Sequence, residues 1–258
     1  STDESALKKI MFPSSAKKNQ QKEVQSHYDI GNDFYRLWLD ETMSYSCGYF
    51  LHEDDTLYQA QVNKVDYILK KLYLKEGMSL LDEELLTVEL MDYRDLPRCG
   101  RRFDRIVSVG MVEHVGRDNY QLFMDCAKEV LNPGGLFLLH FISALKEHPG
   151  DPWIKKYIFP GGVVPSLREM LSCAAEDGFH TMDVENLRLH YNRTLLCWEK
   201  NFKEHISEVR EMFDERFIRM WDLYLSACAA TFHNGLIDLH QVLFTKGIAN
   251  GLPTVRWY

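Results

Sequence analysis

Side chains that can exchange protons stand within or just after short apolar runs in this sequence. Glu113 closely follows the run at 106–109, and His140 lies inside the run at 136–142. A carboxylate and an imidazole that meet can act as acid and base or hold a small polar ligand. Alone, a histidine in an apolar run is more often a core residue. Because consecutive parallel strands end at one edge of a sheet, the two residues together indicate a site.

Asp82 is a third candidate, because it ends an apolar run at 80–81. A carboxylate at the carboxyl end of a strand can meet a ribose or an amino group in a doubly wound fold. The same residue can simply cap a helix. The sequence contains no GxG that would support a nucleotide site. Asp82 by itself therefore leaves both interpretations open.

Hydrophobic periodicity predicts the elements that position these residues. Mostly apolar runs at 78–81, 88–91, 106–109 and 136–142 are typical of strands buried on both faces of a parallel sheet. Helical spacing covers 55–73, 120–131 and most of 191–231, and further strands are expected at 181–189 and 237–244. Asn32 is expected to cap an early helix. The pattern predicts an α/β protein with a doubly wound, mostly parallel sheet.

One junction does not suit this pattern. The runs at 78–81 and 88–91 are separated by only a few residues, whereas a parallel crossover needs at least about 10. The connection also lacks the Gly or Asn that a tight hairpin prefers. Either the numbering runs across a segment that is not shown, or residues are truly deleted. We favour the first interpretation.

Composition excludes several classes of protein. The 258 residues are 45% hydrophobic and carry a formal charge of −8, and no apolar run is long enough to span a bilayer. A nucleic-acid partner is not expected for an acidic chain. Residues 1–22 are a locally basic arm that could touch an anionic surface or simply be solvated.

The six cysteines include no CxxC and no pair with histidine at zinc-ligand spacing, so no metal site is expected. The first residues lack the pattern of a secretion signal. These observations favour free thiols in a reducing cytoplasm.

Longer motifs resemble those of cyclopropane-fatty-acyl-phospholipid synthases and the related mycolic acid cyclopropane synthases. They run in family order from about residue 22 to the C-terminus: SHYDIGNDFY at 26–35, YSCGYF at 45–50, DYRDL at 92–96, FDRIVSVGMVEHVG at 103–116, PGG at 133–135, YIFPGG at 157–162 and HYNRTL at 190–195. Family members follow the strand at Asp82 with a glycine-rich turn that binds S-adenosylmethionine. This sequence departs from the family there, at the junction described above.

The resemblance implies a fold and a reaction. The fold is that of class I S-adenosylmethionine methyltransferases, with a catalytic domain over 23–258 and an added helical lid at about 150–178. The reaction is methylene transfer from S-adenosylmethionine to the cis double bond of an unsaturated phospholipid acyl chain, with bound bicarbonate as base. A homodimer that acts in the cytoplasm at the membrane surface is also implied.

The resemblance also implies roles for particular residues. The bicarbonate would be held by Glu113, His140 and Tyr191 and by the backbone amides of Cys47 and Ile142. S-adenosylmethionine would be contacted by Tyr28, Tyr45, Ser46, Asp82, Asp92 and Tyr93. Two alternatives remain: a related C- or N-methyltransferase that closes no ring, and a non-catalytic lipid-binding or partner-binding protein if the cofactor loop is truly absent.

Overall fold

Four strands form one sheet in the computed structural model, which describes residues 30–74 and 91–258. They are β1 (Phe103–Val109), β2 (Leu131–Ala144), β3 (Phe179–Asn186) and β4 (Ile237–Lys246), in the order β1-β2-β4-β3. β1 pairs with β2 in parallel, and β4 runs antiparallel to both β2 and β3. Three of the four strands therefore point the same way, which confirms the mostly parallel sheet within the described residues. The expected strands at 78–81 and 88–91 lie outside these residues, except for Met91, which belongs to no strand.

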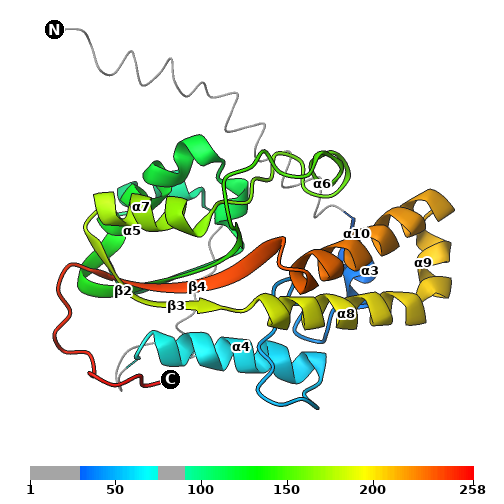
Figure 1. Ribbon diagram of the computed structural model, residues 1–258, viewed down its shortest axis with the longest axis horizontal. Helices are drawn as coiled ribbons and strands as arrows, with labels where there is room; N and C mark the ends of the chain where they lie inside the picture. Colours follow the sequence, from blue (N-terminus) through cyan, green and yellow to red (C-terminus); the bar gives the residue numbers. More distant parts are fainter. Residues whose placement is uncertain (1–29, 75–90) are drawn as a thin grey trace, which may run out of the picture.

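Helices cover both faces of this sheet (Figure 1). α5 (Tyr120–Val130) and α7 (Leu167–Glu176) lie on one face, and α4 (Leu57–Lys71) lies on the other. Leu136 and Leu138 of β2 pack in one cluster with Ile68 of α4, whereas the intervening side chains of β2 pack in another cluster with α5 and α7. Successive side chains of a strand point to opposite faces, so β2 is apolar along its middle because both faces are covered.

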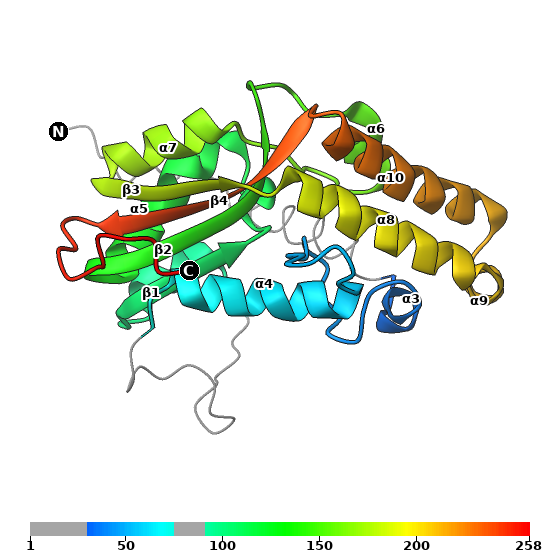
Figure 2. The same ribbon diagram turned by 60° about the horizontal axis from the view of Figure 1, so that its bottom comes forward.

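A largely helical unit continues beyond one end of the sheet (Figure 2). It contains α3 (Asn32–Arg36), α8 (Arg188–Glu204), α9 (Ile206–Met212) and α10 (Glu215–His233). Its core is aromatic: Trp38, Trp198 and Trp221 are completely or almost completely buried. Asn32 is the first residue of α3 rather than its cap. The N-cap position is occupied by Gly31, which has no side chain to cap the helix. The predicted cap was wrong.

Short helices occupy the connections. They are η1 (Tyr93–Arg98), η2 (Val112–His114), η3 (Arg117–Asn119) and α6 (Pro152–Tyr157). The stretch expected to be a lid at about 150–178 divides in two, because Met170 and Ala174 of α7 are buried in the core of the sheet. Only the part around α6 lies over the end of the sheet. None of the helices in the described ranges is both long and apolar enough to cross a bilayer.

Helix α4 begins with a reciprocal pair of hydrogen bonds. Thr56 Oγ1 accepts from the Gln59 amide at 3.2 Å, and Gln59 Oε1 accepts from the Thr56 amide at 2.9 Å. This capping box satisfies two amides that the helix itself leaves free.

We expect Thr56→Ala to lower the free energy of unfolding by about 1 kcal/mol, because the first turn of α4 loses its cap. Urea titration measures the change. Thr254→Ala, at an exposed position of the C-terminal segment, is the matched control and should change stability by less than about 0.5 kcal/mol. Equal losses in both variants would contradict a stabilising role for the cap.

Candidate active site

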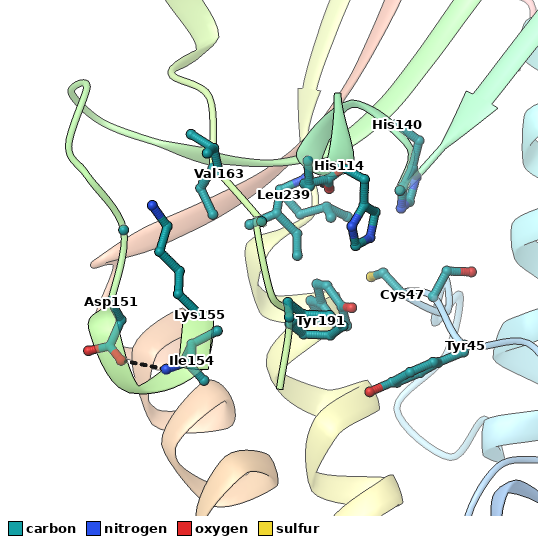
Figure 3. A pocket seen from close by; sticks show the side chains of 18 residues that line it. Tyr45, Cys47, His114, His140, Asp151, Ile154, Lys155, Val163, Tyr191 and Leu239 are labelled. Carbon is teal, nitrogen blue, oxygen red and sulfur yellow. Dashed lines mark hydrogen bonds between the residues drawn. The ribbon is translucent and has the colours of Figure 1, made fainter. Parts of the chain in front are cut away.

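A cavity of about 130 Å³ lies where the carboxyl ends of β1 and β2 meet the helical unit. Figure 3 shows Cys47, His140 and Tyr191 directed toward this space from different elements. Its lining includes all five residues expected to hold bicarbonate and two expected to contact the cofactor: Cys47, Glu113, His140, Ile142, Tyr191, Tyr45 and Ser46. The tertiary structure therefore brings together residues that are up to 146 positions apart.

Glu113 lies in η2, in the turn that follows β1. Its Oε1 accepts a hydrogen bond of 2.7 Å from the amide of Ile142 in β2, and its backbone oxygen accepts one from Val163 at 2.8 Å. The other carboxyl oxygen, Oε2, is buried and has no partner among the described residues. Burial raises the pKa of Glu113 to about 7, against the opposing effect of the Ile142 amide. Glu113 can therefore carry or release a proton near neutral pH.

The Ile142 amide has a partner within the protein. The resemblance assigns this amide to the bicarbonate, and in this structure it donates to the Glu113 carboxyl. Ile142 thus positions Glu113, and it contributes its side chain to the wall of the cavity.

His140 is held in one tautomer by its neighbour across the sheet. Gln241 pairs with His140 in register, and its Nε2 donates to Nδ1 of the imidazole at 3.1 Å. An amide nitrogen can only donate, so the proton of the neutral ring resides on Nε2. Nε2 is buried without a partner in the described part of the chain. Burial, with a smaller effect of Lys64, lowers the pKa of His140 to about 3, so the ring is neutral at physiological pH.

Cys47 and Tyr191 also stay neutral. Burial raises the pKa of the Cys47 thiol and that of the Tyr191 hydroxyl well above their usual ranges. A buried thiol is a poor nucleophile, which suits a role for the Cys47 backbone rather than its sulfur. The neighbouring amide of Gly48 is held by Thr194 Oγ1 at 3.0 Å, which fixes the course of this segment.

Two polar residues on the buried side of α4 were missed by the sequence interpretation. Gln61 Nε2 donates to the backbone oxygen of Ser46 at 2.9 Å, and Lys64 Nζ donates to Ser46 Oγ at 2.9 Å. Lys64 is buried, and burial lowers its pKa to about 8. Gln61 and Lys64 follow Leu57 at helical spacing, so they lie on the buried face of α4. Polar residues at positions where the helix is otherwise apolar were the signal in the sequence that could have identified them.

Two of the expected cofactor residues that the structure describes, Asp92 and Tyr93, do not line this cavity. Tyr93 lines a separate groove along β1, together with Met91 and Phe123. The carboxylate of Asp92 accepts hydrogen bonds from Arg94 at 2.7 and 2.8 Å. Tyr28 and Asp82 lie outside the described residues.

Comparison with known proteins identifies the family. The family model of mycolic acid cyclopropane synthetase matches residues 15–84 and 83–242. This chain belongs to that family. A cyclopropane-fatty-acyl-phospholipid synthase of Escherichia coli K12 is 38% identical over 271 positions, which cover 90% of this chain and 70% of the relative. A probable fatty acid methyltransferase of Pseudomonas putida is 36% identical over 290 positions, which cover 93% of this chain and 73% of the relative.

A solved structure supports the same fold. The cyclopropane synthase MmaA2 of Mycobacterium tuberculosis superposes with a TM-score of 0.79 and 31% identity, covering 87% of this chain and 98% of that chain. The α/β architecture with its helical addition is therefore the methyltransferase fold of this cyclopropane synthase family.

The family match is itself divided at the unusual junction, because its two parts meet at residues 83–84. Alignments with the two bacterial relatives extend over 290 and 271 positions, more than the 258 residues of this chain. The relatives therefore contain residues that have no counterpart here. The sequence is continuous at this point, and residues 78–99 include no glycine. These findings favour a true deletion over a segment that is not shown.

The raised pKa of Glu113 has a consequence for stability. An acid whose pKa is higher in the folded state binds its proton more tightly when folded. Its contribution to stability is therefore complete below the unfolded pKa, near 4.3, and is lost as the pH rises through about 7. We expect Glu113→Gln to remove this dependence.

The measurement is urea unfolding of both proteins at pH 5 and pH 8. Between pH 5 and pH 8, the free energy of unfolding of the variant should rise by about 2 to 3 kcal/mol relative to that of the wild type. Glu129→Gln, at an exposed position on α5, is the control and should show no such gain. A difference between Glu113→Gln and wild type that is the same at both pH values would exclude proton binding by Glu113.

Proposed function

We propose that this chain catalyses S-adenosylmethionine-dependent methylene transfer to the cis double bond of unsaturated phospholipid acyl chains, forming a cyclopropane ring, with bicarbonate as base. The observation that carries the proposal is the pair of buried polar atoms, Glu113 Oε2 and His140 Nε2, in one cavity with no partner in the described ranges. The family supports it, since one relative is named a cyclopropane-fatty-acyl-phospholipid synthase. A similar solved structure, CmaA1, is described as complexed with SAH.

The residues around the cavity suit a small anion. Near pH 7 Glu113 is partly protonated, so it can donate a hydrogen bond from Oε2, and His140 can donate a second from Nε2. The hydroxyl of Tyr191 is a further donor on the same wall. Lys64 adds positive charge behind Ser46. When bound, bicarbonate would supply the base that accepts a proton from the newly added methyl group.

S-adenosylmethionine needs more room than this cavity provides. Sites for drug-sized ligands take about 300 Å³ or more, against about 130 Å³ here. Tyr45 and Gly110 suit its sulfonium end, because aromatic faces attract cations and a Cβ added to Gly110 would meet no atom within 4 Å. When bound, the cofactor supplies an electrophilic methyl group. Contacts to its nucleoside must come from residues other than those around the cavity.

The remaining task of the chain is to keep water from the reacting acyl chain. An alkene is a weak nucleophile, and the positive charge that develops on it would be captured by water. Apolar side chains cover much of the cavity: Ile142, Ile154 of α6, Phe159, Val163, Val164 and Leu239.

We further propose that the protein acts in the cytoplasm as a homodimer at the membrane surface.

A second candidate function follows from the divided family match. If the missing family residues are needed to hold the nucleoside, the chain binds lipid without catalysis. Calorimetric titration with S-adenosylmethionine separates the two functions, because only the enzyme must bind the cofactor.

The direct test uses purified protein, S-adenosylmethionine and vesicles of unsaturated phospholipid, with and without bicarbonate. We expect mass spectrometry of the released fatty acids to show one added methylene per reacted double bond, and the rate to depend on bicarbonate. Methylated chains without rings would indicate the related methyltransferase instead. No lipid product, together with no cofactor binding, would support the non-catalytic alternative.

Glu113→Gln tests the role of the carboxyl. The amide keeps the acceptor for the Ile142 amide but cannot exchange a proton, so we expect turnover to fall by about 100-fold or more. Cofactor affinity, measured by calorimetry, should be unchanged, because Glu113 serves the base and not the nucleotide. Parallel losses of turnover and cofactor affinity would refute this assignment.

A further inference from the structure

Two leucines project side by side beyond the end of the sheet that carries the cavity. Ala144 at the end of β2 pairs with Ile237 at the start of β4, so Leu145 and Leu236 are the next residues on neighbouring strands. Their exposed fractions are 78% and 69%, among the highest of the large apolar side chains. Exposing apolar surface to water costs free energy. Adjacent exposed apolar side chains therefore indicate a surface that a membrane or another molecule covers.

Helix α6 adds aromatic side chains beside them. Both ribbon views place α6 next to α10, whose end leads through Leu236 into β4 (Figures 1 and 2). The rings of Trp153 and Tyr157 lie 5.8 Å apart, and Tyr157 is 39% exposed. Tryptophan and tyrosine are enriched where proteins meet lipid headgroups, because each has an apolar body and a polar tip.

The same region presents basic side chains. Lys146 and Lys156 are exposed, and Lys156 lies over the ring of Tyr157 at 5.1 Å. Neither lysine forms an ion pair with a carboxylate of the described residues. The nearby acids have other partners, since Asp151 caps α6 and Glu147 binds Arg168. A chain with a net charge of −8 is repelled on average by an anionic surface, so local unpaired lysines are what would reverse that repulsion.

The chain between Leu145 and the end of α6 also contributes to the cavity wall. Gly150, Asp151, Ile154 and Lys155, between the leucines and the end of α6, line the cavity itself. We name Leu145, Lys146, Trp153, Lys156, Tyr157 and Leu236 the rim. We propose that the rim docks the protein on an anionic phospholipid bilayer, with the leucines entering the interface and the lysines meeting headgroup phosphates. This deepens the proposed function, on which it rests, because the cavity then opens toward the acyl chains.

The test is cosedimentation of the full chain with vesicles of phosphatidylcholine, with and without phosphatidylglycerol. We expect the double variant Leu145→Glu/Leu236→Glu to bind anionic vesicles at least about tenfold more weakly than wild type. Lys146→Gln/Lys156→Gln should lose roughly 30-fold at low salt and become nearly insensitive to salt, because each lysine near the surface contributes independently. Leu196→Glu/Leu223→Glu, at exposed positions on α8 and α10, is the matched control and should bind normally.

The outcomes separate this inference from the proposed function. Circular dichroism and thermal unfolding identify any variant that fails to fold, and the lysine variant then provides the test at exposed positions. Weaker binding of the rim variants supports the rim even if no cyclopropane is formed. Unchanged binding of both rim variants would overturn it, even if cyclopropane is formed. Binding that is lost only when residues 1–22 are removed would overturn it in favour of the N-terminal arm.

Discussion

The hydrogen bond from the Ile142 amide to the Glu113 carboxyl is the contact on which the site depends. It joins the turn after β1 to the carboxyl end of the next strand, and it satisfies one oxygen of a buried acid. Burying a carboxyl without any partner would cost several kcal/mol, so one backbone donor is what allows Glu113 to remain inside. The second oxygen stays available to the cavity. Stability and reactivity thus arise from the same half-satisfied group.

The sheet register serves the other side of the cavity in the same way. His140 has a defined tautomer because Gln241 faces it across β2 and β4. A slip of one residue between these strands would turn Gln241 to the opposite face and leave the imidazole free to present either nitrogen. The two strands are buried in the core through Leu138, Leu139, Val242 and Leu243, which makes such a slip costly. Core packing therefore determines which proton the histidine offers.

The family match is divided at residues 83–84, next to Asp82, and this division does not touch the cavity. Glu113, His140 and Tyr191 line the cavity and come from later parts of the chain. The contacts of Gln61 and Lys64 with Ser46 fix the cavity wall from α4. Cofactor binding is accordingly the property that decides between an enzyme and a lipid-binding protein.

Local patterns were enough to predict much of this molecule. The strands at 106–109, 136–142, 181–189 and 237–244 and the helices at 55–73 and 120–131 are confirmed with shifted ends, because burial on both faces and helical periodicity are written in short stretches. The meeting of Glu113 and His140 followed from strand order alone. The end of the lid at 178 could not be predicted from local patterns. The Pro and Gly residues of this stretch indicated a loop, although its second part forms the core helix α7.

The sequence by itself determined the element types, the family and seven of the residues that line the cavity. Only the tertiary structure decided that the Ile142 amide holds Glu113, that Gln241 sets the tautomer of His140, and that Tyr93 lies in another groove. The physical reason is that these outcomes depend on register and side-chain direction between segments far apart in the chain. Hydrophobic periodicity predicts the type of each segment. The hydrogen bonds between segments depend on how the segments pack together in the core.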